Sequence, residues 1–295
     1  MARNRSSDAT FAARKKKELR RRGWCKTERD YRLMTAWFDR PRIITEGDSW
    51  FAYPPKNIIG LEAANVIDHI RRWTKSKASI LRLESNGDEA SNIVSGEQKH
   101  KLARLLSKFK PAILLFSGGG NDIAGAWDLE RLLNKYKPGF TAEQCLRRPR
   151  LNRKLKRIEL AYRELLELCV DYSPKTVVIT HGYDYPFPTG KGAKFLKGLF
   201  KTKGWIKRFM DAKSIPSSMQ REVITIMLKD MQERLNIIAS SPANSKRFKV
   251  VATQGTLPNE TDWLNEMHPT KKGFEKIARK IYAEMRKVTP ELPSI

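Results

Sequence analysis

Five short apolar runs recur along the chain, and longer amphipathic stretches separate them. The runs are continuously apolar and rich in β-branched residues, a pattern typical of strands buried on both faces. They are RIITEG from Arg42, ASILRLE from Ala78, AILLFSG from Ala112, KTVVITHG from Lys175 and RFKVVATQG from Arg247. The pattern predicts a mostly parallel sheet of five strands.

The amphipathic stretches between the runs repeat apolar residues at helical spacing. Examples are LARLLSKF from Leu102 and LKRIELAYRELLELCVDY from Leu155. Because strands and helices alternate, we expect an α/β fold, a doubly wound three-layer α/β/α sandwich. In such sheets, ligands bind beyond the carboxyl ends of the strands, near the point where the strand order reverses.

The chain divides into three parts by composition. Residues 1–41 contain RKKKELRRR and predict a basic helical N-terminal extension, residues 42–288 form the α/β domain, and residues 289–295 form a short tail. The extension is either a solvated arm or a binder of anionic surfaces.

An insertion at about 190–216 interrupts the alternation of strands and helices. Its sequence predicts a basic amphipathic helix. The apolar face of this helix would carry Phe195, Leu196, Leu199, Phe200, Ile206, Phe209 and Met210, with Lys194, Lys197, Lys201 and Arg208 opposite. Two interpretations stay open, a lid packed on the protein's own core or an element that touches anionic lipid.

Charge indicates which partners the surface favours. The chain of 295 residues has 58 basic and 32 acidic side chains, a formal net charge of +26. This charge favours anionic partners such as a phospholipid membrane surface, nucleic acid or an acidic polysaccharide. The sequence has neither a secretory signal nor an apolar run long enough to span a membrane, so we expect a cytoplasmic protein, with unconventional export left open.

Cysteine and histidine usage bears on metals and cofactors. Cys25, Cys145 and Cys169 are widely spaced, which indicates neither a disulfide framework nor a zinc site. A metal-dependent phosphoesterase would need several converging His and Asp ligands, and the chain has four histidines with no H-x-H or D-x-H spacing. We therefore expect no metal and no cofactor.

Polar clusters follow all five predicted strands. In chain order they are GDSW, SNGDEAS, SGGGNDIAG, HGYDYPFP and TDWLNEMHPTKKGFEKIA. Turn chemistry alone would explain Gly-Asp-Ser after the first strand. It does not predict that every cluster lies at the same edge of the sheet, where a doubly wound protein has its active site.

These clusters contain the groups that acyl transfer needs. A serine hydroxyl is a poor nucleophile unless a base takes its proton, and His268 is the only histidine after the last strand, so Ser49 and His268 are candidate nucleophile and base. The oxyanion needs hydrogen-bond donors, for which the candidates are the backbone amides of Ser49 and Gly87 and the side-chain amide of Asn121.

Four of the sequence blocks, GDSW, NGD, GGGND and NEMHPT, resemble the ordered blocks of the SGNH hydrolases, also called the GDSL esterase/lipase family. The resemblance spans about residues 42–282. It implies a serine ester hydrolase that acts on lipid or acylated carbohydrate, with Ser49 as nucleophile, Gly87 and Asn121 in the oxyanion hole, and His268 as base. A non-catalytic module that binds nucleic acid or another polyanion is the alternative; it accounts for the charge but not for the four blocks.

One departure from the family pattern concerns the residue that orients the histidine. The family usually has an aspartate three residues before it, where this chain has Asn265, and the nearest upstream aspartate is Asp262. Asn265, Asp262 or a backbone carbonyl could orient His268, and we favour Asn265. His181 either borders the pocket or is structural, and Asp48 and Asp122 are expected in turn or cap roles.

Overall fold

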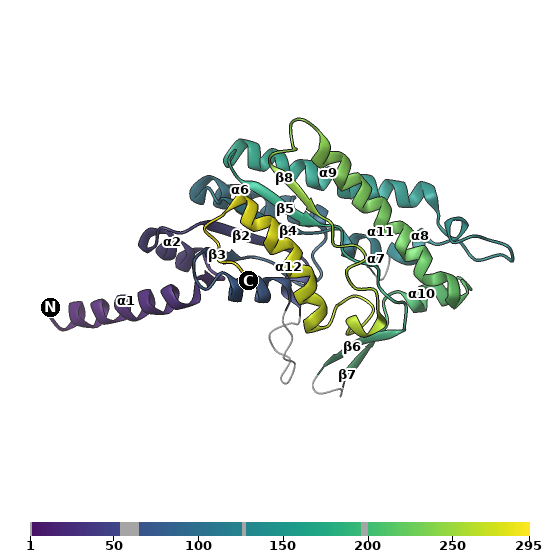
Figure 1. Cartoon of the computed structure of the whole chain (residues 1–295), viewed down its shortest axis with the longest axis horizontal. Coiled ribbons are helices and arrows are strands. Elements are labelled where there is room, and N and C mark those ends of the chain that lie inside the picture. Colours follow the sequence, from purple (N-terminus) through teal and green to yellow (C-terminus); the bar gives the residue numbers. More distant parts are fainter. Residues whose placement is uncertain (1, 54–64, 126–127, 196–199) are drawn as a thin grey trace.

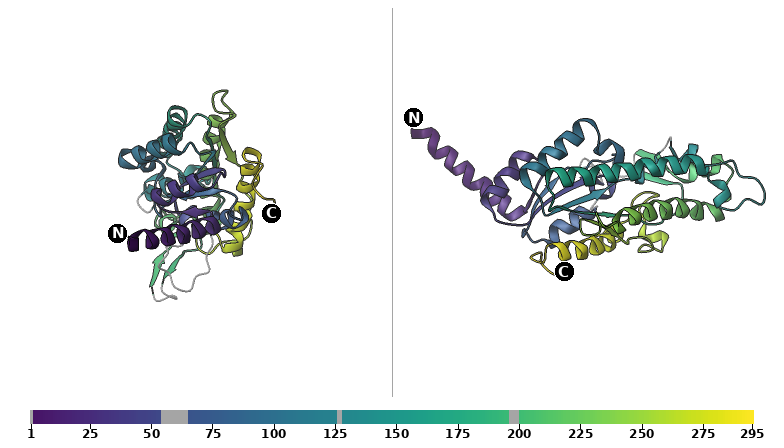
Figure 2. Two further views of the ribbon diagram at one scale, coloured as in Figure 1. Left: turned by 90° about the vertical axis from the view of Figure 1, so that its left-hand side faces the viewer. Right: turned by 90° about the horizontal axis from the view of Figure 1, so that it is seen from above.

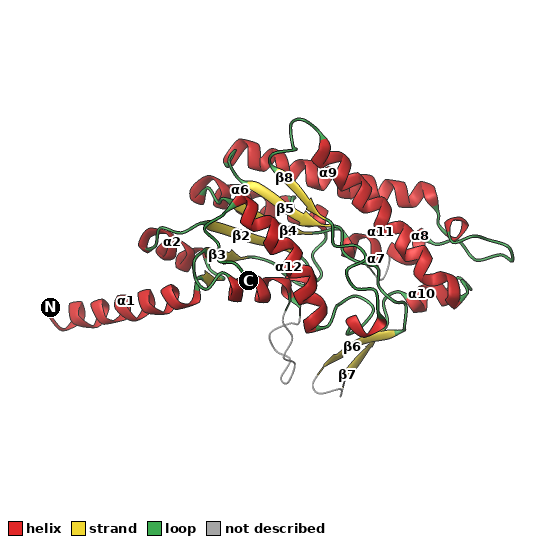
Figure 3. Cartoon of the chain, viewed as in Figure 1, coloured by secondary structure: helices red, strands yellow, loops and turns green. Residues whose placement is uncertain are grey.

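The computed structural model describes residues 2–53, 65–125, 128–195 and 200–295. One parallel sheet has the strand order β1-β3-β2-β4-β5-β8 (Figures 1 and 3). The strands are β1 Trp24–Cys25, β2 Arg42–Gly47, β3 Ser79–Arg82, β4 Ile113–Ser117, β5 Val177–His181 and β8 Phe248–Val251. All five predicted strands are present, and the fold class is confirmed.

The prediction of five strands is wrong by one, because β1 adds a sixth at the edge of the sheet. β1 pairs Trp24 with Ile80 of β3. A strand of two residues is too short to show any periodicity, so the sequence pattern did not reveal it. Of the segment predicted as an extension, α1 (Ala2–Arg22) projects away from the body in Figures 1 and 2, whereas β1 is part of the sheet.

Helices cover both faces of the sheet, as right-handed crossovers require (Figure 2). The helices on one face are α2 Glu28–Trp37, α6 Gly96–Phe109 and α9 Arg148–Tyr172, with α11 Ser217–Ser240 packed against α9. On the other face, α4 (Val66–Trp73) packs against α12 (Lys271–Val288). Among helices of the described ranges, none is long and apolar enough to cross a membrane.

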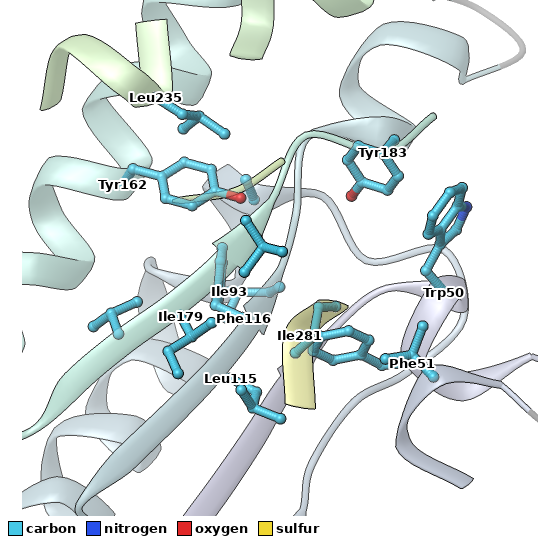
Figure 4. Packing of buried hydrophobic residues seen from close by; sticks show 14 of the residues in the cluster. Trp50, Phe51, Ile93, Leu115, Phe116, Tyr162, Ile179, Tyr183, Leu235 and Ile281 are labelled. Carbon is cyan, nitrogen blue, oxygen red and sulfur yellow. The ribbon is translucent and has the colours of Figure 1, made fainter. Parts of the chain in front are cut away.

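The core lies around the two central strands, which is why their sequences are continuously apolar. Ile44 of β2 pairs with Leu114 of β4, and both side chains are fully buried. Leu115 and Phe116 lie beside them, in contact with the helical layers (Figure 4). Because the six strands of this sheet are parallel, the loops after them meet at one edge of the sheet.

The prediction of an amphipathic helix in the insertion is wrong for its first half. Lys191–Phe195 (β6) and Phe200–Lys203 (β7) form an antiparallel hairpin, and a short helix, α10 (Lys207–Ala212), follows. Glycines recur through this stretch and lower its helix propensity, while the apolar and basic residues fit a strand period as well as a helical one. Leu196 and Leu199, placed on the predicted helix face, lie outside the described residues.

Candidate active site

Ser49 lies where β2 ends, between the ends of β3 and β4. The strand order reverses at β2, and this reversal is the usual ligand site of a doubly wound sheet. Gly47 permits the chain to pass close to β4: its φ is +144°, and a Cβ there would lie 2.3 Å from the Ser117 carbonyl oxygen. Asp48 then caps α3 (Ser49–Ala52) by accepting a hydrogen bond from the backbone two residues on. The local chain thus presents Ser49 at the first position of a helix.

His268 contacts Ser49 from the loop before α12. The His268 Nε2 atom is 2.8 Å from the Ser49 Oγ, and the Nδ1 atom is 3.1 Å from the Asn265 Oδ1. The same Asn265 oxygen accepts the backbone N–H groups of Met267 and His268, at 2.9 Å each. Because this side-chain atom of Asn265 accepts two N–H groups, it must be the amide oxygen, which can only accept hydrogen bonds. Nδ1 of the His268 imidazole must therefore carry a proton and donate it to this oxygen. Nε2 is therefore unprotonated and accepts a hydrogen bond from the serine hydroxyl, the arrangement that a general base requires.

Aromatic rings enclose the His268 imidazole. Tyr53 stacks on it with ring centroids 3.8 Å apart and an interplanar angle of 10°, and Trp205 meets it edge to face at 6.1 Å. The side chain is 6% exposed, and this burial lowers the pKa of His268 to about 3. The ring is thus neutral, and able to take a proton, throughout the neutral pH range.

Asn121 lies at the serine pocket, and Gly87 precedes Asp88, whose carbonyl oxygen accepts a hydrogen bond from Asn121. Asn121 is on α7 (Gly120–Ala124), and its side-chain amide donates to the Asp88 carbonyl at 2.9 Å. Asn121 and Ser49 line the same pocket, whereas Gly87 is not among the described residues that line it. Gly87 is exposed, with a φ of +89°. Two of the five predicted site residues, Ser49 and Asn121, therefore line one pocket. His268 and Asn265 join it through their hydrogen bonds to Ser49 and to each other, and Gly87 lies next to Asp88, which accepts a hydrogen bond from Asn121.

The pocket beside Ser49 is narrow and mainly apolar. Its apolar walls include Trp50, Ile206, Ile224, Leu228, Trp263 and Met267. Its free volume is about 30 Å³, only somewhat more than one water molecule requires. A pocket of this size accommodates a small group rather than a long alkyl chain.

A second serine–histidine pair, Ser117 and His181, is completely buried behind Asp48. The His181 Nδ1 atom accepts the Tyr183 backbone N–H at 3.2 Å, so Nε2 carries the proton and donates it to the Ser117 Oγ at 3.0 Å. The Ser117 hydroxyl donates in turn to Asp48 at 2.8 Å, and the Tyr183 hydroxyl donates to the other Asp48 oxygen. His181 is thus a donor to its serine and cannot act as its base.

Packing fixes these buried groups against the first turn of α3. Trp50, next to Ser49, stacks on His181 with ring centroids 5.2 Å apart and meets the Tyr183 ring edge to face (Figure 4 shows Trp50 and Tyr183). The indole N–H of Trp50 donates to the Met267 carbonyl at 3.0 Å. This bond joins the helix that carries the serine to the loop that carries the histidine.

The other polar residues identified in the sequence have structural partners. Asp122 accepts the Ala90 backbone N–H at 2.9 Å, and burial raises the pKa of Asp122 to about 6. Asp262 accepts hydrogen bonds from the Asn259 backbone and from Lys276, so Asn265 and not Asp262 contacts the imidazole. Across the described ranges, no group of three or more His, Cys, Asp or Glu side chains is arranged to hold a metal ion.

Glu266 is a buried residue of the site that the sequence did not reveal. Its Oε1 accepts the backbone N–H groups of Gly190 at 2.8 Å and Lys207 at 3.0 Å, and its Oε2 accepts that of Ile206 at 2.8 Å. Gly204 lies so close that a Cβ there would be 2.5 Å from Oε2. Glu266 therefore holds the base of the hairpin and the start of α10 against the His268 loop. Its partners are too distant in sequence for any local pattern to predict these contacts.

Two solved lipases are similar to this chain in structure. A lipase from a goat rumen metagenome has 14% sequence identity and a TM-score of 0.53, and the match covers 82% of this chain and 96% of the lipase. An extracellular lipase from Streptomyces rimosus has 15% identity and a TM-score of 0.50, covering 84% of this chain and 100% of the lipase. The chain has the SGNH hydrolase fold.

No family model matches the chain, and no curated protein sequence matches it. At 14% and 15% identity, the similarity concerns the fold.

Proposed function

We propose that this chain is a serine ester hydrolase of the SGNH type that cleaves an acyl ester through a covalent acyl-enzyme. The observation that carries the proposal is the 2.8 Å hydrogen bond from Ser49 to the His268 Nε2, with Nδ1 occupied by Asn265. In this tautomer the imidazole can take the serine proton. The fold that the chain shares with two lipases supports an ester as the substrate.

In the proposed reaction, the Ser49 Oγ attacks the ester carbonyl carbon while the His268 Nε2 takes the hydroxyl proton. The carbonyl electrons move to oxygen, and the oxyanion is stabilised by the backbone amide of Ser49 and the side-chain amide of Asn121, which both line the pocket. When the carbon–oxygen bond to the alcohol breaks, the alcohol leaves with the proton from His268. Water then attacks the acyl-enzyme, with His268 first taking its proton and afterwards returning one to Ser49.

The dimensions of the pocket favour a short acyl group. Its free volume of about 30 Å³ and its apolar walls suit an acetyl group better than a fatty acyl chain. The preference for a short acyl group applies whether the alcohol part of the ester is glycerol-based or a carbohydrate. The ratio of kcat/KM for p-nitrophenyl acetate and p-nitrophenyl octanoate measures the preference.

Covalent labelling with a fluorophosphonate probe tests the proposal. We expect the wild type to be labelled, mass spectrometry to place the label on Ser49 rather than on Ser117, and Ser49→Ala to lose both label and esterase activity. Loss of a triad member typically removes several powers of ten in rate. A folded wild type that is neither labelled nor active, with circular dichroism as the control for folding, would favour the non-catalytic polyanion-binding alternative.

A further inference from the structure

A hollow lined with basic side chains lies between α9 and α8 (Asp128–Leu132), with a free volume of about 610 Å³. Four of its basic residues recur along α9 at spacings of three and four, so they share one face of that helix. The basic residues lining it are Arg131, Arg150, Arg153, Lys154 and Arg157. We call this feature the arginine hollow.

The charges of the arginine hollow are poorly compensated. Lys154 is 9% exposed and pairs with Asp128 at 3.2 Å and Glu89 at 3.9 Å. In the part of the chain that the structure describes, none of the four arginines of the hollow forms an ion pair. By contrast, Arg148 on the same helix pairs with both Glu143 and Asp230. Like charges one helical turn apart repel each other, and an anion bound in the hollow would remove that cost.

The arginine hollow lies next to the candidate active site. Lys154 contacts Glu89, which belongs to the loop that follows Gly87. The Asp128 backbone N–H donates to the Gly125 carbonyl at 3.0 Å, directly after the helix that carries Asn121. Figure 1 shows α7 and α8 close together beyond the ends of the strands. The hollow and the Ser49 pocket are therefore linked through α7 and α8, with Asn121 lining the pocket and Asp128 lining the hollow.

We propose that the arginine hollow binds a phosphate group on the alcohol part of the substrate, while the acyl group enters the pocket at Ser49. This inference rests on the proposed esterase function. Guanidinium groups present paired donors that match the oxygens of phosphate, so several of them can hold a doubly charged group. The two sites are complementary, since one is apolar and small whereas the other is cationic and wide. The substrate class is thus a short-chain acyl ester of a phosphorylated alcohol.

Binding of inorganic pyrophosphate, measured by calorimetry at physiological salt, tests the hollow without catalysis. We expect the triple variant Arg150→Gln/Arg153→Gln/Arg157→Gln to bind roughly tenfold or more weakly, because each charge-assisted hydrogen bond is lost. The matched control, Arg14→Gln/Lys17→Gln/Arg20→Gln on α1, removes three exposed positive charges as well and should bind like the wild type. Equal weakening in both variants, or no binding by the wild type, would overturn the site.

Kinetics with two matched esters tests the role in substrate binding. The substrates are acetylglycerol phosphate and acetylglycerol. In the arginine-hollow variant, we expect KM for the phosphate ester to rise roughly tenfold with kcat unchanged, and both constants for the neutral ester to stay at wild-type values. Equal KM values for the two esters in the wild type would overturn this inference while leaving the esterase intact. If the protein hydrolyses neither ester but pyrophosphate binding still depends on the three arginines, the esterase proposal fails and the hollow remains an anion site.

Discussion

At the residue scale, two serine–histidine pairs lie at the same end of the sheet, and their hydrogen bonds run in opposite directions. At Ser49 and His268, the Asn265 oxygen takes the Nδ1 proton, so Nε2 accepts. At Ser117 and His181, a backbone N–H occupies Nδ1, so Nε2 donates. Contact between a serine and a histidine is therefore not sufficient for nucleophilic catalysis. The partner of the other ring nitrogen decides which atom holds the proton.

The first prediction at this scale concerns the orienting residue. We expect Asn265→Ala to lower kcat by roughly a hundredfold or more, because the imidazole loses the acceptor that selects its tautomer. Asn265→Asp keeps an acceptor at the same position and should retain activity. The matched control is Asp262→Ala, which removes a contact to Lys276 and leaves the ring in place. Steady-state kinetics that ranked Asp262→Ala as the more harmful change would transfer the role to Asp262.

The second prediction at this scale concerns pH. Burial lowers the pKa of His268 from its ordinary value of 6.5 to about 3. The fraction of neutral, proton-accepting imidazole should then stay constant as pH falls from neutral toward 5, so kcat/KM should show no inflection near 6.5. A pH–rate profile on an uncharged ester measures this, with circular dichroism at each pH as a control for folding. An acid limb centred near pH 6.5 would mean that the free enzyme exposes the imidazole to water.

At the element scale, one carboxylate organises the insertion. The hairpin and α10 meet the His268 loop through three backbone N–H groups, all bonded to Glu266. Ile206, one of these donors, also lines the Ser49 pocket. The wall of the pocket and the position of the histidine therefore depend on the same side chain.

We expect Glu266→Ala to lower the free energy of unfolding by about 2–4 kcal/mol, because buried N–H groups lose a charged acceptor. Hydrogen exchange should become faster in peptides that contain Gly190, Ile206 and Lys207. Glu260→Ala is the matched control, since Glu260 holds the same segment through Lys191, but in an exposed pair of small energetic value. Equal exchange rates in the two variants would show that packing, not Glu266, holds the insertion.

At the scale of the whole molecule, the net charge of +26 is the dominant electrostatic property. Such a charge favours anionic ligands and makes the compact state repel itself. The structure spreads part of this charge along α1, whose last turn ends in Arg20, Arg21 and Arg22, and concentrates another part in the arginine hollow. Repulsion is thus expected to act on stability as well as on binding.

We expect Tm to rise by several degrees when NaCl is increased from about 0.01 to 0.15 M, because the screening length falls from about 30 to about 8 Å. Calorimetry or circular dichroism measures the shift. The α1 triple variant, which lacks three of the positive charges, should show a smaller rise. A Tm that falls with salt would mean that attractive ion pairs outweigh the net repulsion.

The sequence by itself determined those features that depend on neighbours along the chain. Burial on both faces makes a central strand continuously apolar, so β2 and β4 were predictable from their composition. Parallel strands end at one edge of the sheet, so the residues after them, Ser49 and His268 included, could be placed together before any contact was known.

Tertiary structure alone decided those features whose partners are remote in sequence. The edge strand β1 is visible only in its pairing with β3, and the hairpin in place of a helix depends on contacts at its base. The position of the proton on the His268 ring depends on which Asn265 atom faces the ring. Glu266 holds the insertion through backbone N–H donors that are 59 to 76 residues away in sequence. The spacing of the arginines of the hollow also occurs on many solvated helices, so the sequence alone did not indicate a binding site there. The physical reason is the same in each case, since a local pattern records burial and backbone preference, whereas the direction of a hydrogen bond and the pairing of a charge depend on what lies across the fold.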